Sequence, residues 1–197
     1  MDAALDPRAR EVLDCWFGAP GSAEFGTDRK QWFKRNAAFD EMLRARFGVL
    51  IDAGLAGELD AWQATPLGAL ALVIVLDQFS RNCHRNTARA FAADALALRV
   101  AQRMVESGAD LQLPTPYHRA FVYLPYEHSE SPDVQRESLR LAAQLQAEPI
   151  DPSYYRAAVR HAQVIGRFGR YPHRNAILGR ESTDDERAFL EQRGSSF

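Results

Sequence analysis

The 197-residue sequence contains very little lysine, since only Lys30 and Lys34 are found among its 24 basic residues. It also lacks an excess of charge: the formal net charge is -2, which argues against the broad basic face that nucleic-acid binding requires. Cysteine is scarce as well. Cys15 and Cys83 have no CxxC or CxxH neighbour, so we expect neither a disulfide framework nor a structural zinc site, and a cytoplasmic setting is natural.

Long hydrophobic runs are absent too. The longest one, Leu67 to Leu76, has ten residues including Gly68, which is too short to span a membrane. Residues 1–14 are charged and contain no apolar segment of the kind found in signal peptides. No GxSxG, GxxxxGKS/T or GxGxxG motif is present, so neither a cofactor nor a membrane partner is expected.

The chain does contain many signals for helix starts. Asp6-Pro7, Ser131-Pro132 and Asp151-Pro152 each place a capping residue before or at a proline, and Thr183 to Glu186 forms a capping box. The segment from Pro66 to Leu76 is apolar on all sides, which predicts a central, buried helix. No stretch alternates with period two long enough to predict a sheet.

Three boundaries are predicted from the same kinds of signal. One helix should start near Thr27 and carry Trp32 and Phe33, another should run unbroken over residues 87–107, and Pro125 should end a helix that starts at residue 116. In total we predict roughly nine helices joined by short turns. Residues 1–197 would then form a single all-α domain of antiparallel helical hairpins.

The segment His161 to Thr183 is unusual because it holds four arginines and two histidines but a single acid, Glu181. Arginine presents a rigid fork of donors that can hold a carboxylate or phosphate bidentately. Glycines and a proline interrupt the helix here, so the chain must turn and the charged groups can converge. We interpret this segment as one wall of a polar pocket, although arginines that pin helix ends would give the same pattern.

His161 lies on the apolar stripe of its helix, together with Tyr154, Ala158, Ile165 and Phe168. A histidine on that stripe must find hydrogen-bond partners, either as an ordinary core residue or as a group in a pocket. Both interpretations remain open.

Carboxylates and a histidine also gather in Glu127-His128-Ser129-Glu130, and the central helix ends in Asp77, Gln78, Arg81 and Asn82. The spacing matches no strong metal-ligand pattern, so no metal is expected and the acids are interpreted as counter-charges to the arginines. The candidate acid–base groups are His128, His161, His173, Glu127 and Glu130. The candidate ligand-binding residues are Asp77, Gln78, Arg81, Asn82, Arg167, Arg170, Arg174, Asn175 and Arg180.

Three motifs give the chain a family resemblance. LDQFSRN at Leu76–Asn82, LPYEHSE at Leu124–Glu130 and RFGRYPHRNAILGREST at Arg167–Thr183 resemble the signatures of the bacterial domain-of-unknown-function 924 family. The sequence departs from that pattern in having Asn86 where glycine is expected. The resemblance implies an all-helical, tetratricopeptide-like fold, and it implies no activity.

Three functions are compatible with these residues. The leading hypothesis is a pocket that binds a small anionic molecule through Arg81, Arg170 and Arg174; whether it catalyses a reaction is left open. The first alternative is a tetratricopeptide-like scaffold whose polar cluster is purely structural and whose protein partner is unknown. The second alternative is a metal-dependent hydrolase.

Overall fold

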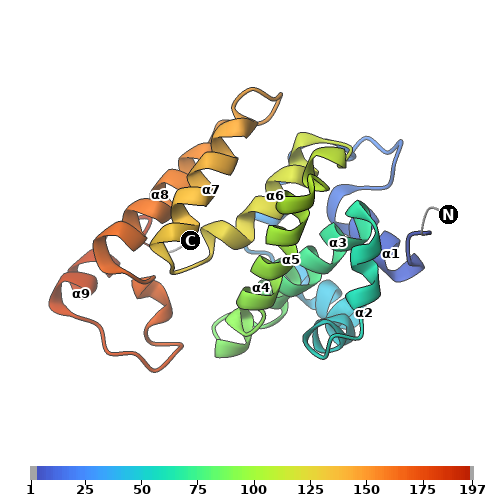
Figure 1. The fold of residues 1–197 in the computed structure, drawn as a ribbon. Coiled ribbons are helices and arrows are strands. Elements are labelled where there is room, and N and C mark those ends of the chain that lie inside the picture. The colour runs from blue at the N-terminus through green and yellow to red at the C-terminus, as the bar shows by residue number, and fades with distance from the viewer. Residues whose placement is uncertain (1–3, 196–197) are drawn as a thin grey trace.

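The computed structural model describes residues 4–195, and within that range the chain is helical and contains no strand (Figure 1). The all-α prediction is therefore confirmed. The α-helices are α1 (Pro7–Phe17), α2 (Ala37–Leu55), α3 (Pro66–Val73), α4 (Ser80–Cys83), α5 (Asp94–Ser107), α6 (Pro116–Glu127), α7 (Pro132–Leu145), α8 (Ser153–Phe168) and α9 (Asp184–Leu190). Short 3-10 turns connect them: η1 (Lys30–Trp32), η2 (Asp60–Ala64), η4 (Ala88–Phe91), η5 (Asp110–Gln112) and η6 (Pro172–Arg174).

One long helix consists of three of these segments. A π-helical stretch, η3 (Ile74–Phe79), joins α3 to α4 without a break, and the whole helix forms the centre of the fold. Thr65 caps its start by accepting a hydrogen bond from the backbone N–H of Gly68 (3.1 Å). Gly68 is required there, because a Cβ atom at this position would lie 2.2 Å from the carbonyl oxygen of Trp62.

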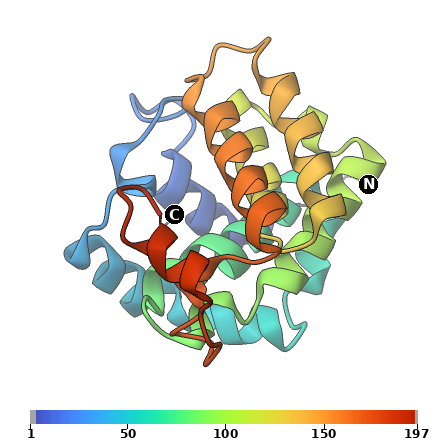
Figure 2. The same ribbon diagram turned by 90° about the vertical axis from the view of Figure 1, so that its left-hand side faces the viewer.

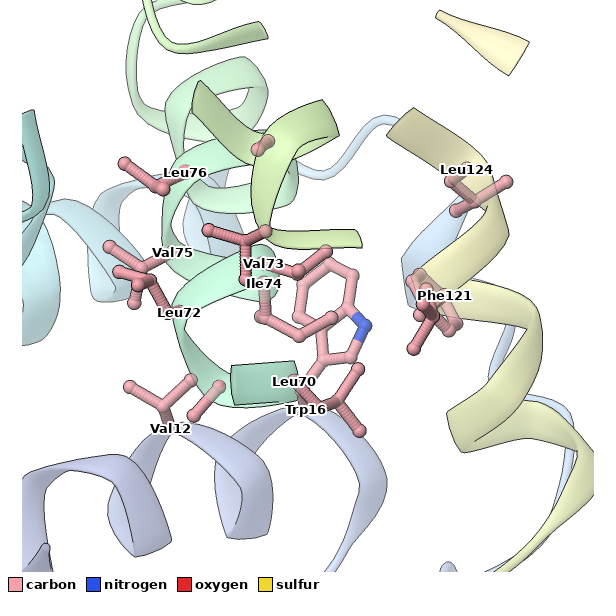
Figure 3. Packing of buried hydrophobic residues seen from close by; sticks show 14 of the residues in the cluster. Val12, Trp16, Leu70, Leu72, Val73, Ile74, Val75, Leu76, Phe121 and Leu124 are labelled. Atoms are coloured by element: carbon pink, nitrogen blue, oxygen red, sulfur yellow. The ribbon is translucent and has the colours of Figure 1, made fainter. Parts of the chain in front are cut away.

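The hydrophobic core surrounds this central helix. Leu70, Val73, Ile74 and Leu76 are fully buried in it. Figure 3 shows Trp16 of α1 between the central helix and α6. The Trp16 ring makes edge contacts with Phe79 and Phe121 (centroid distances of 5.6 Å for both). Such packing contributes beyond the burial of area alone.

The C-terminal half of the chain extends from this core. α7 packs against both α6 and α8, and α7 and α8 lie side by side as an antiparallel hairpin (Figures 1 and 2). A smaller apolar cluster, separate from the main core, consists of Val164 and Ile165 of α8 and Tyr171. Phe168 and Phe189 are partly buried and pack against this cluster. The comparison with tetratricopeptide repeats and the single-domain assignment remain predictions. Within residues 4–195 no helix is both long enough and apolar enough to cross a membrane.

Local signals located most helix ends correctly. Asp6 caps α1 through the backbone N–H of Arg8 (2.8 Å), and Thr183 with Glu186 forms the predicted capping box of α9. Asn86 has a φ of 61°. That left-handed conformation explains why glycine is the expected residue at this position, since asparagine tolerates it better than most other side chains.

Three predicted boundaries were wrong. α6 continues through Pro125 to Glu127, because the residues around it are buried in the core and tertiary packing outweighs the lost hydrogen bond. The predicted helix over residues 87–107 is split into η4 and α5, and the one near Thr27 is only the 3-10 turn η1. Tertiary contacts decide such short segments more than local propensity does.

Candidate functional site

The site is built around a pair of side chains: Asp77 of η3, which is buried, and His128, which follows α6 and is partly exposed. The Asp77 side chain is fully buried, and its Oδ1 accepts a hydrogen bond from Nδ1 of His128 (2.7 Å). Gln78 donates to its Oδ2 (2.7 Å), and Nη1 of Arg81 lies 3.0 Å from Oδ1. Asp77 is thus held by three donors from two segments that lie 51 residues apart in the sequence.

These contacts fix the protonation states of the pair. Burial alone would raise the pKa of Asp77, but Arg81 and His128 hold it well below its usual range. Burial and the nearby Arg81 lower the pKa of His128 more than Asp77 raises it. His128 is therefore neutral at pH 7, with its hydrogen on Nδ1 toward the carboxylate, and Nε2 carries the lone pair that can accept a proton.

The π-helical geometry of η3 provides the position of Asp77. Each backbone hydrogen bond of a π-helix encloses one more residue than in an α-helix, which widens the helix, and such segments occur frequently at functional sites. In η3 the widened turn carries Asp77 and Gln78 within the core-facing helix, and Arg81 follows in α4. Arg81 follows Asp77 by four residues, so the two side chains meet on one side of the helix.

A second carboxylate, Asp94 at the start of α5, joins two arginines. Arg81 binds it through both Nη atoms (2.8 and 3.0 Å), and Nη1 of Arg174 lies 3.2 Å from Oδ2. Arg174 also donates to the carbonyl oxygen of His128 (3.1 Å), and its guanidinium lies 4.6 Å from the ring centroids of both Phe91 and Tyr171. Arg174 therefore ties α5 to the end of α6.

An open cleft of about 420 Å³ lies over these groups. Its charged and polar lining consists of Asp94, His128, Ser129, Glu130 and Arg174. The apolar lining residues are Ala88, Phe91, Ala92, Ala95, Leu98, Pro125 and Leu178. The volume is within the range of roughly 300–1,000 Å³ that is usual for small-molecule sites.

Glu127 and His161 form a more deeply buried pair beside the cleft. His161 Nδ1 donates to the carbonyl oxygen of Ala157 (2.8 Å) and lies 3.3 Å from Oε2 of Glu127. That Glu127 oxygen is buried and accepts no hydrogen bond of normal geometry from any described residue. Burial, together with the charge of Asp77, raises the pKa of Glu127 to about 8, and burial lowers the pKa of His161 to about 3. Both side chains are therefore neutral at pH 7.

Two other arginines of the C-terminal segment, Arg170 and Arg180, are held by carboxylates. Arg180 binds Glu130 through both Nη atoms (2.7 and 3.0 Å) and donates to Oδ1 of Asn175 (3.0 Å). Arg170 also binds a carboxylate bidentately: its Nε and Nη2 atoms donate to the two carboxylate oxygens of Glu186 (2.6 and 2.8 Å). Of the acids that the sequence led us to expect as counter-charges, Asp77 pairs with Arg81 and Glu130 with Arg180, whereas Glu127 faces a histidine. Glu186, which was not expected in this role, is the partner of Arg170.

Of the predicted site residues, only His128, Glu130 and Arg174 line the cleft, and several lie elsewhere. Arg167 is exposed and contacts the rings of Phe168 and Phe189. Asn82 points away from Arg81 and donates to Asp40 (2.7 Å), which also binds Arg85. His173 does not line the cleft, and its ring packs against Tyr171 at a centroid distance of 5.6 Å.

Sequence reasoning missed Asp94, Phe91 and Tyr171 as members of this cluster. Asp94 was not nominated because residues 87–107 were predicted to form one amphipathic helix. An acidic residue in such a helix is expected to lie on its solvent-exposed face. The signal that could have revealed it is the surplus of arginine over acid in the three motifs, since buried guanidinium groups need partners. Among residues 4–195, no three His, Cys, Asp or Glu side chains are grouped so as to hold a metal ion.

Comparison with known proteins places the chain among helical bacterial proteins. The family model described as "Bacterial protein of unknown function (DUF924)" matches residues 12–194, so the chain belongs to that family. The chain is also similar to a solved structure of a protein of unknown function from Agrobacterium tumefaciens, with 36% sequence identity and a TM-score of 0.83. The match covers 93% of this chain and 97% of the Agrobacterium chain. No curated protein matches the sequence significantly.

Proposed function

We propose that the cleft binds a small molecule through an anionic group, and that His128 serves as the proton acceptor if the bound molecule reacts. The observation that carries this proposal is the Asp77–His128 pair at 2.7 Å beside a cleft that Arg174 also lines. A neutral histidine whose Nδ1–H is fixed by a carboxylate is the arrangement in which Nε2 acts as a general base.

Arg174 is the residue best suited to contact the anion. A guanidinium has five N–H donors. Arg174 uses Nη1 to bind Asp94 and Nη2 to bind the carbonyl oxygen of His128, and each of these nitrogens carries a second hydrogen. Arg81 does not line the cleft, but it binds Asp94, which does, and so adds positive charge near the cleft. Arg170 and Arg180 are held bidentately by carboxylates and do not line the cleft, so in this proposal they shape the segment and do not clamp the ligand.

A thermal-shift screen of small carboxylates and phosphate monoesters tests the proposal. We expect a hit whose stabilisation is lost in Arg174→Gln but kept in Arg170→Gln, because Arg170 has a comparable carboxylate partner and does not line the cleft. Arg174→Lys serves as a second variant that keeps the charge and removes the fork. The proposal fails if no anion stabilises the protein, or if the hit stabilises Arg174→Gln as strongly as the unchanged chain.

A further inference from the structure

The charged groups that line the cleft are mainly acidic. Asp94 and Glu130 line it, and neither Arg81 nor Arg180, their main partners, is among the described lining residues. The Asp94 and Glu130 side chains are 20% and 29% exposed, whereas Arg174 is only 8% exposed. The two carboxylates are therefore more exposed to a ligand in the cleft than the single guanidinium is.

Both carboxylates retain capacity to accept hydrogen bonds. Oδ1 of Asp94 accepts one bond, from Arg81, and Oε2 of Glu130 accepts one bond, from Arg180. A carboxylate oxygen can accept two. Glu130 is ionised at neutral pH, because Arg180 and the backbone N–H of Tyr171 lower its pKa against the opposing effect of burial. An ammonium group, with three donors and a positive charge, has the chemistry that complements such acceptors.

The remaining wall of the cleft is apolar. It consists mainly of the side chains of Phe91, Ala95, Leu98, Pro125 and Leu178. The Leu178 side chain is exposed despite its size. An apolar portion of a ligand would remove this surface from water, which favours binding.

We propose that the ligand is a zwitterion of the amino-acid class with an apolar side chain. This inference rests on the proposed function, because Arg174 holds the carboxylate of the ligand as before. Asp94 and Glu130 hold its ammonium group, and its side chain packs on the apolar wall. The nearby Nε2 of His128 then lies close to the substituents of the carbon that bears both charged groups.

Three matched probes test the inference by isothermal titration on the full chain. They are L-phenylalanine, 3-phenylpropanoate, which lacks only the amine, and 2-phenylethylamine, which lacks only the carboxylate. We expect L-phenylalanine to bind at least about tenfold more tightly than either, since each lost group leaves charged partners in the cleft unpaired. If 3-phenylpropanoate binds within threefold of L-phenylalanine, the inference is overturned while the proposed function stands.

If none of the three probes binds at millimolar concentration, the inference is also overturned, and the anion screen with Arg174→Gln decides the proposed function separately. Glu130→Gln should reduce the preference for L-phenylalanine over 3-phenylpropanoate to below threefold and leave the affinity for 3-phenylpropanoate unchanged. Asp94→Asn provides the same comparison if the first variant does not fold. Glu186→Gln, which removes a carboxylate from an arginine pair outside the cleft, should keep the preference. An equal loss of both ligands in Glu130→Gln and Asp94→Asn would indicate a structural role and contradict the inference.

Discussion

Replacing Glu127 with glutamine should make the protein less sensitive to alkaline pH. Glu127 is 3% exposed, and burial and the charge of Asp77 raise its pKa from 4.5 to about 8. In the unfolded chain the same carboxyl group loses its proton near pH 4.5. Between these two values the folded protein binds the additional proton, so its free energy of unfolding decreases as pH rises through this window.

The size of the effect follows from the pKa values. From pH 7 to pH 9 the folded carboxyl passes through its pKa while the unfolded one stays ionised, which costs about 1.4 kcal/mol of stability. For a chain of this length that corresponds to a decrease in melting temperature of roughly 3–6 °C. Glutamine carries no charge at any pH, so Glu127→Gln lacks this contribution.

Urea unfolding of both proteins at several pH values measures the effect. The quantity of interest is the difference in unfolding free energy between Glu127→Gln and the unchanged chain, because histidine, cysteine and tyrosine titrations cancel in it. This difference should move by about 1.4 kcal/mol in favour of the variant between pH 7 and pH 9. Glu186→Gln is the control: Arg170 lowers the pKa of Glu186, so its difference should stay constant. A constant difference for Glu127→Gln would refute the assignment of a neutral buried carboxyl group.

Two further predictions concern the central helix. Gly68→Ala should destabilise the protein by about 1–3 kcal/mol or more, because its Cβ would lie 2.2 Å from the Trp62 carbonyl oxygen; Gly166→Ala, with no atom near its added methyl group, should be neutral or stabilise by up to about 1 kcal/mol. Thermal unfolding checks both, and equal effects would contradict the packing described. Asp77→Asn should lower the pKa of His128 further, because it removes the carboxylate that favours the imidazolium. NMR titration of the His128 ring measures this, and an unchanged or raised pKa would contradict the pairing.

The sequence predicted the helical class and most helix starts because those signals are local. Asp6 and Thr183 cap their helices through neighbouring backbone groups, and such contacts require no knowledge of the fold. The prediction that Pro125 ends a helix was wrong because the contacts that keep α6 helical there are not local. Its cost as a helix breaker is a local quantity, whereas the packing of α6 against α5 and α7 that sustains the helix involves distant segments.

Part of the candidate site could likewise be predicted from local patterns, and part could not. Asp77 and His128 could be nominated because polar residues at the ends of apolar helices stand out in the sequence. Which arginine lines the cleft could not be predicted. Arg170, Arg174 and Arg180 look equivalent in the sequence, and only the positions of Glu186, Asp94 and Glu130 distinguish them. Partner choice across tens of residues depends on helix packing, which local patterns do not encode.

The π-helical turn of η3 has a consequence for how the site depends on chain length. Deleting one residue between Ile74 and Phe79 would allow the helix to return to ordinary α geometry, and the segments on either side would keep nearly their present orientation, because the wider turn is what takes up the extra residue. The apolar side chains of α3 would then keep their places and most of the core would stay filled, while the residues within the turn would be displaced. Asp77 has no substitute on the other faces of the helix, and His128 would lose the partner that orients its ring.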